Sequence, residues 1–172
     1  MGQKVGKAVY QEEAIPFVNL SQPSIESLWE AFNDIADGFG VSLYEFKEIC
    51  AEVKDELNLN RAKMDEKALA LFVLLDADKN GLVDGIEFIT TIAAVSGMRE
   101  RTILDFMFTS YDFDGTGNLT IDEVTLAMKG VLMGVCKLTG EKAPPEEELE
   151  LLALEGLDRK STRLNSSHAN IS

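Results

Sequence analysis

The stretch DADKNGLVDGIE, residues 76–87, places four acidic side chains, an asparagine and two glycines within twelve positions, between apolar segments. A second stretch, DFDGTGNLTIDE at residues 112–123, repeats its register. Both have aspartate at positions 1 and 3, glycine at 6, an apolar residue at 8 and glutamate at 12. A solvated acidic loop would explain the charge. It would not explain why the glycine at position 6, the apolar residue at position 8 and the glutamate at position 12 recur in the same register. The spacing therefore predicts two copies of one folded loop, called loop 2 and loop 3 below.

Alternate positions of both loops carry oxygen atoms suited to a hard cation. Ca²⁺ takes six to eight oxygens, so a chain must curl around it, and a bidentate glutamate at position 12 favours Ca²⁺ over the stricter Mg²⁺. Position 7 contributes its backbone carbonyl, and position 9 usually acts through water. We expect two Ca²⁺ sites, with Mg²⁺ possible at rest. The predicted ligands are Asp76, Asp78, Asn80, Leu82, Asp84 and Glu87 in loop 2, and Asp112, Asp114, Thr116, Asn118, Thr120 and Glu123 in loop 3.

A helix–loop–helix unit occurs three times along the chain. Each copy begins with an apolar triplet at spacing i, i+1, i+4, which suits one face of a helix. The triplets are Ala31, Phe32, Ile35; Leu71, Phe72, Leu75; and Met107, Phe108, Tyr111. The sequence predicts an all-α fold with very short β pairing between loops, Ser24 and Ser42 as N-caps, and Pro145 in a first helical turn. The predicted helices cover residues 24–37, 43–56, 64–75, 85–96, 99–111, 121–133 and 145–157.

Both loops resemble EF-hands. Loop 2 matches the D-x-[DN]-x-[DN]-G pattern fully, and loop 3 carries Thr116 as a common variant at position 5. The resemblance implies antiparallel helix–loop–helix units that assemble in pairs. The layout is similar to four-hand sensors of the neuronal calcium sensor and calcineurin B-like groups, in which loop 2 would lie beside the loop ending at Glu45.

That loop, residues 36–45, is called loop 1 and is shorter than the others. Ten positions separate Ile35 from Glu45, against twelve in the other units. Counting back from Glu45 puts Asp34 at position 1 but leaves phenylalanine where the glycine should be. We predict an EF-hand shape without an ion. Loop 2 has four carboxylates at ligand positions and loop 3 has three, so loop 2 should bind at least as tightly.

Composition restricts the partners. With 16 basic and 30 acidic residues the net charge is −14, which disfavours nucleic acid and anionic membranes and favours cations or basic peptides. Cys50 and Cys136 form no CxxC pair and are expected to be buried, reduced thiols. The chain lacks a secretory signal or membrane-spanning run, so a cytoplasmic location is expected. Membrane contact would require myristoylation of Gly2, which is disfavoured because Gly6 stands where a hydroxyl residue is expected; otherwise the N-terminus would be a flexible arm.

Four segments are expected: an arm at residues 1–23, a lobe with the first two hands at 24–96, the third hand and the incoming helix of an incomplete fourth at 97–157, and a tail at 158–172. The tail, which holds His168, resembles the translation of a sequencing-library adapter, and the expectation is a natural chain ending at Leu157 through truncation. A disordered natural tail is the alternative.

Three functions fit this sequence. The first is a calcium sensor that exposes an apolar groove to a target helix, and the methionines suited to such a groove are Met64, Met98, Met107, Met128 and Met133, although core packing is their commoner role. Trp29 is expected in the core. The alternatives are a calcium buffer that does not open, and a regulatory subunit or light chain held permanently on an enzyme or cytoskeletal target. No nucleophile–base constellation is present, so an enzyme is not expected.

Overall fold

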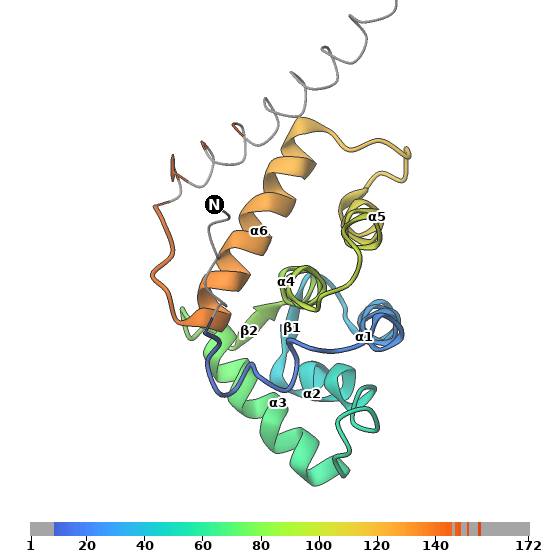
Figure 1. Ribbon diagram of the computed structural model, residues 1–172, viewed down its shortest axis with the longest axis vertical. Helices are drawn as coiled ribbons and strands as arrows, with labels where there is room; N and C mark the ends of the chain where they lie inside the picture. The colour runs from blue at the N-terminus through green and yellow to red at the C-terminus, as the bar shows by residue number, and fades with distance from the viewer. Residues whose placement is uncertain (1–8, 146, 149–150, 152–154, 156–172) are drawn as a thin grey trace, which may run out of the picture.

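The computed structural model describes residues 9–145, 147, 148, 151 and 155. The described part is mostly helical, with one two-stranded sheet, and confirms the predicted all-α class (Figure 1). The elements in chain order are α1 (Gln22–Ile35), β1 (Gly40–Ser42), α2 (Leu43–Ala51), α3 (Arg61–Leu75), β2 (Leu82–Asp84), α4 (Gly85–Val95), α5 (Glu100–Tyr111) and α6 (Ile121–Thr139).

The six predicted helices that fall in this part are present, but several ends differ. Helix α1 begins after Ser21, so the prediction of Ser24 as its N-cap is wrong; Ser24 lies inside the helix and donates from its hydroxyl to Glu56. Helix α2 ends at Ala51, before a series of turns. Helix α6 runs to Thr139, six residues beyond its predicted end at 133, and stops at Gly140, whose φ of 73° is the left-handed C-cap conformation.

The seventh predicted helix, residues 145–157, lies mainly outside the described residues, and so does the whole tail at 158–172. Pro145 itself is not helical, although its carbonyl accepts a hydrogen bond from the Glu148 backbone.

The small sheet joins loop 1 to loop 2. Strands β1 and β2 are antiparallel, with Val41 opposite Val83, and the Gly85 N–H adds a bond to the Phe39 carbonyl at 2.8 Å. This confirms that the two loops lie side by side. Both valines are buried, as expected for the apolar position 8.

The core is aromatic where α2, α3 and α4 meet. Phe46 is fully buried, with ring centroids 5.6 Å from Phe72 and 4.9 Å from Phe88. Cys50 lies in the same core, where burial raises the pKa of its thiol. Both cysteines are free, but Cys136 is only half-buried, so the expectation that both are buried is wrong for that residue.

The residues before α1 are part of this core. Phe17 and Leu20 are buried, and the Phe17 ring meets the edge of Phe88 at 6.4 Å. Gln11 donates its N–H to the Leu138 carbonyl at 2.7 Å and its side-chain amide to the Thr139 carbonyl at 3.1 Å. The flexibility expected of the N-terminal arm therefore does not extend to this segment, because it inserts apolar side chains and fastens the end of α6.

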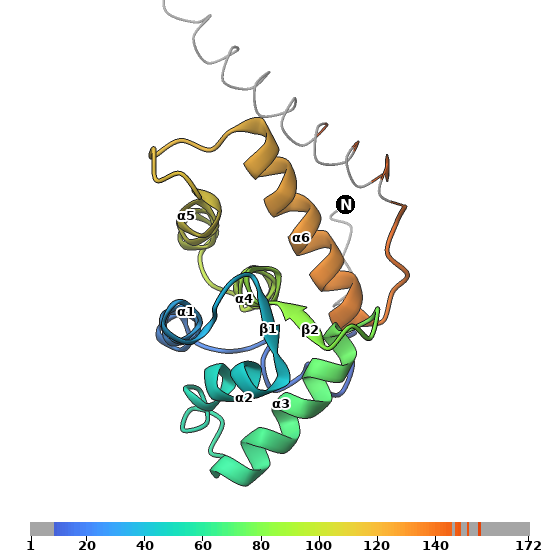
Figure 2. The ribbon, with the colours of Figure 1, turned by 180° about the vertical axis from the view of Figure 1, so that it is seen from behind.

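Helix α4 is the central support. It packs against α1, α5 and α6, and Figures 1 and 2 show it between α6 and the pair formed by α1 and α5. Helix α6 approaches it closely at Gly134, where a Cβ would collide with the Thr91 side chain. No described helix has the length and apolar character needed to cross a membrane.

Candidate metal-binding loops

Loop 2 is organised by its first aspartate. Asp76 follows the last residue of α3, and its carboxylate accepts the N–H of Asn80 and the N–H of Gly81, both at 3.1 Å. The tight curl needs left-handed backbone at Lys79 (φ 58°) and Gly81 (φ 82°). A Cβ on Gly81 would meet nothing within 4 Å, so the requirement for glycine is conformational rather than steric.

The remaining predicted ligands of loop 2 lie around the same curl. The Asn80 amide donates to Asp78 at 2.9 Å, and its oxygen accepts the Leu82 N–H at 2.8 Å. Asp84 caps α4 by accepting the Glu87 N–H at 2.8 Å. A helix cap is thus built from two predicted ligands, so the loop and the start of α4 are one structural unit.

Loop 3 repeats this pattern position by position. The Asp112 carboxylate accepts the N–H groups of Thr116 at 3.1 Å and Gly117 at 3.0 Å. Gly115 and Gly117 have φ values of 65° and 73°, matching Lys79 and Gly81. Two segments that share only a spacing pattern therefore fold into the same curl.

The donor set and the shared curl fit a hard cation, and the side chains at position 12 show what coordination would require. Within the described part of the chain, no three Asp, Glu, His or Cys side chains converge closely enough to hold a metal ion. One oxygen of the Glu123 carboxylate accepts the Thr120 N–H and hydroxyl, both at 2.8 Å, and the other accepts the Phe113 N–H of loop 3 at 3.3 Å. The Glu87 carboxylate accepts from the Lys137 ammonium of α6 at 2.8 Å. Glu87 must leave Lys137 to act as a ligand, whereas one Glu123 oxygen already accepts an N–H inside loop 3. The twelve predicted ligands stay predictions.

The environment of Glu87 differs from that of Glu123. Burial raises the pKa of the Glu87 carboxyl, and the hydrogen bond and charge of Lys137 oppose that rise. Lys137 was not singled out from the sequence. It lies 50 residues from Glu87 in another helix–loop–helix unit, and no local pattern links the two.

Loop 1 uses its glutamate to build a helix cap. Glu45 accepts the Ser42 N–H and hydroxyl, both at 2.7 Å, in a capping box that confirms Ser42 as the N-cap of α2. Both bonds lower the pKa of Glu45, and the bond from the Ser42 hydroxyl has the larger effect. Asp34 lies within the last turn of α1 rather than in the loop. The expectation that this loop takes no ion stays a prediction.

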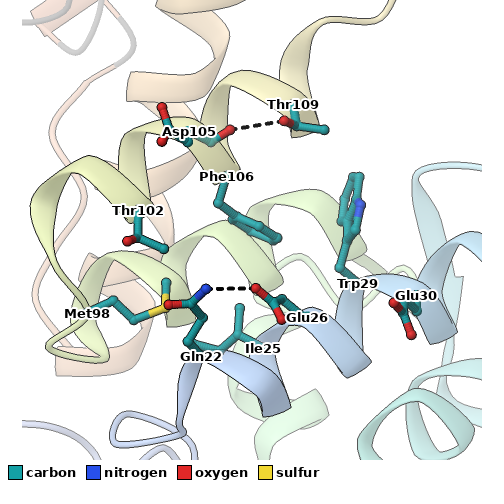
Figure 3. A pocket seen from close by; sticks show the side chains of 10 residues that line it. All are labelled: Gln22, Ile25, Glu26, Trp29, Glu30, Met98, Thr102, Asp105, Phe106 and Thr109. Carbon is teal, nitrogen blue, oxygen red and sulfur yellow. Dashed lines mark hydrogen bonds between the residues drawn. The ribbon is translucent and has the colours of Figure 1, made fainter.

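A groove of mixed polarity, lined by four apolar and six polar side chains, lies between α1 and α5. Helices α1 and α5 line a cavity of about 520 Å³, with Trp29, Met98 and Phe106 among its walls (Figure 3). The rings of Trp29 and Phe106 meet edge to face at 5.7 Å, so Trp29 is half-buried at the groove rather than sealed in the core. Glu26, Glu30 and Asp105 supply acidic groups around it.

The five methionines proposed for a groove separate in the structure. Met98 lines this cavity, Met64 is fully buried in the core, and Met107 packs partly against the core. Met133 lines a smaller cavity of about 310 Å³ beside loop 2, and Met128 is partly buried.

Comparison with curated proteins finds similarity to proteins named for calcium dependence and to a recoverin family protein. Calcium-dependent protein kinase 22 of Arabidopsis thaliana is 33% identical over 117 residues, which are 67% of this chain and 22% of the kinase. Calcium-dependent protein kinase 9 of Oryza sativa subsp. japonica is 28% identical over 110 residues, 64% of this chain and 18% of the kinase. A recoverin family protein of Dictyostelium discoideum is 29% identical over 111 residues, 62% of this chain and 48% of that protein.

The chain thus spans about a fifth of the length of these kinases and about half of the recoverin family protein. No protein-family model matches it. No solved structure matches it either.

Proposed function

The chain belongs to the EF-hand calcium-binding superfamily, and on that premise we propose that it is an intracellular calcium sensor, which binds two Ca²⁺ and then presents an apolar groove to a target helix. The relatives support calcium binding itself. The observation that carries the proposal is the common curl of loops 2 and 3, in which the aspartate at position 1 organises the backbone of each loop through the same two N–H groups.

The response would begin at the glutamates. Bound Ca²⁺ supplies two positive charges that offset the repulsion among the loop carboxylates. Glu87 lies in the first turn of α4, and turning its carboxylate inward would pull on that turn. Helix α4 supports both α1 and α5, whose side chains form the groove. A shift of α4 would therefore change the separation of the groove walls, which is the kind of opening that sensor EF-hands undergo.

The groove suits a helix that is apolar on one face and basic at its edges. Trp29, Met98 and Phe106 offer apolar surface, while Glu26, Glu30 and Asp105 add negative charge around it. The net charge of −14 favours the same kind of target. We propose no catalytic activity, a cytoplasmic location and Mg²⁺ as a resting occupant of the loops.

Two other functions predict different behaviour. A calcium buffer would bind in the same loops without moving α4, and a permanent regulatory subunit would stay on its enzyme or cytoskeletal target with or without Ca²⁺. Opening and reversible association therefore distinguish the sensor from both.

Binding of an environment-sensitive apolar dye tests the opening. The sensor predicts that saturating Ca²⁺ increases dye fluorescence and changes Trp29 emission, while Mg²⁺ at the same concentration has a smaller effect. Glu87→Gln should reduce the response, because it removes the ligand that connects loop 2 to α4. If Ca²⁺ binds but dye binding does not change, the sensor proposal is wrong and the protein is a calcium buffer. If the protein is recovered in complex with one partner whether or not Ca²⁺ is present, it is a permanent regulatory subunit.

A further inference from the structure

Lys137 occupies the carboxylate that loop 2 needs for calcium. Its ammonium lies 2.8 Å from Glu87 Oε1, and the side chains are only 22% and 16% exposed. Both side chains are less exposed than those of the Arg61 pairs with Glu48 and Asp65. A half-buried pair is screened less by solvent and salt than a surface pair, so this contact affects the energy of whatever else uses Glu87.

The chemistry of position 9 explains why Glu87 has a lysine partner. In loops 1 and 3 the residue three positions before the glutamate is Ser42 or Thr120, and its N–H and hydroxyl donate to the glutamate. In loop 2 that residue is Asp84, a carboxylate that has no hydroxyl to donate and repels Glu87. A partly buried carboxylate without a donor is costly, and Lys137 supplies both the donor and the opposite charge.

We propose that Lys137 is an internal competitor for the calcium site of loop 2, so that Ca²⁺ binding there displaces its ammonium from Glu87 and loosens the end of α6. This rests on the calcium binding proposed above. A bidentate glutamate uses both oxygens, so Ca²⁺ and the Lys137 ammonium would share Oε1, and the repulsion between these two cations opposes binding of both. Lys137 also lines the cavity beside loop 2 together with Asp78, Asn80 and Asp84, so its charge repels a cation approaching the loop.

Displacement would couple two hands that are distant in sequence. The end of α6 lies beside loop 2 in both views of the ribbon (Figures 1 and 2). In the described residues it is held there by the bridge from Lys137, and by the bonds from Gln11 to Leu138 and Thr139. If this ion pair is lost, the hydrogen bonds from Gln11 still hold the last turn of α6 to the N-terminal segment. Ca²⁺ in the second hand would thereby increase the mobility of the outgoing helix of the third hand.

The test measures Ca²⁺ affinity at loop 2 alone. In a Glu123→Gln background, which disables loop 3, Lys137→Gln is compared with Lys142→Gln by chelator-competition titration. Both changes remove one positive charge, but Lys142 is exposed and beyond the end of α6. We expect Lys137→Gln to bind roughly fivefold or more tightly than Lys142→Gln, because a partly buried pair no longer has to be broken. Lys137→Arg, which keeps the charge, should remain close to the parent.

A second readout reports on folding and on α6. Without Ca²⁺, Lys137→Gln should have a lower Tm than Lys142→Gln, because Glu87 loses its partner. Ca²⁺ should raise the Tm of Lys137→Gln by more than it raises the Tm of Lys142→Gln. In the parent, amide exchange near residues 135–139 should accelerate when Ca²⁺ binds. Equal affinities and equal Ca²⁺-induced Tm shifts for Lys137→Gln and Lys142→Gln would overturn the inference and leave calcium binding intact. If Glu123→Gln alone does not bind Ca²⁺, then binding at loop 2 is itself overturned, and the inference with it.

Discussion

Gly134 shows how one missing side chain sets the position of a helix. A Cβ at this site would collide with Thr91 of α4, so only glycine permits this approach of α6. The Thr91 hydroxyl is buried and has no hydrogen-bond partner among the described residues. The contact therefore depends on close packing rather than on polar bonding. This approach also brings the end of α6, with Lys137, to loop 2.

Gly134→Val should lower the free energy of unfolding by roughly 2 kcal/mol or more, because overpacking a tight contact forces backbone shifts. Thr91→Ala alone should cost no more than about 1 kcal/mol, since the hydroxyl it removes is unpaired. Urea denaturation of both single variants and the double variant measures the coupling. Gly134→Val should cost less in the Thr91→Ala background than in the parent, and an equal cost in the two backgrounds would contradict this packing.

The shared register of loops 2 and 3 was predictable from the spacing of their residues, and both loops have the same curl. The twelve ligands themselves stay predictions. The partner of Glu87 could not be predicted in this way. Lys137 reaches Glu87 only because α6 continues past Gly134 and lies on α4. A contact that depends on the tertiary crossing of two helices leaves no trace in local sequence.

Helix beginnings were more predictable than helix ends. Ser42 caps α2 as expected, because a capping box is local chemistry. Helix α1 instead begins at Gln22, with Pro23 in its first turn, where proline is favoured. The ends depended on packing: α6 passes through two glycines that lie against Thr91 and Tyr111, and it stops only at Gly140, where the backbone turns left-handed.

The cap of α2 predicts a pH dependence. Hydrogen bonds from Ser42 lower the pKa of Glu45 in the folded protein. The charged carboxylate therefore contributes its full stabilisation above the unfolded-state pKa of about 4.3. That stabilisation is lost as the pH falls through the lower pKa of the folded protein. Glu45→Gln should cost about 0.5 kcal/mol at pH 7 in chelator, because glutamine can keep the capping-box contact but removes the negative charge from the first turn of the helix.

The cost of that variant should shrink as the pH is lowered below about 4, because the parent then loses its charged carboxylate as well. Glu66→Gln, a change at an exposed position of α3, serves as the control and should cost little at any pH. A cost for Glu45→Gln that is the same at pH 3 and pH 7 would contradict the charged cap.

At the scale of the whole molecule, helix α4 lies between the end of α6 and the groove formed by α1 and α5. Loops 1 and 2 are joined by β1 and β2. The sequence predicted the paired loops through the family layout. It did not predict that Ala14, Phe17, Val18 and Leu20 enter the core. This segment is short, and the burial of Phe17 depends on Phe88, which is distant in sequence.

We propose that loops 2 and 3 hold calcium and that loop 1 is structural. Calorimetric titration of the whole chain with Ca²⁺ tests it most directly. We expect two Ca²⁺ per chain, one after Glu87→Gln, one after Glu123→Gln, and still two after Glu45→Gln. A count of three that falls to two in Glu45→Gln, or a count of two that survives both Glu87→Gln and Glu123→Gln, would contradict it.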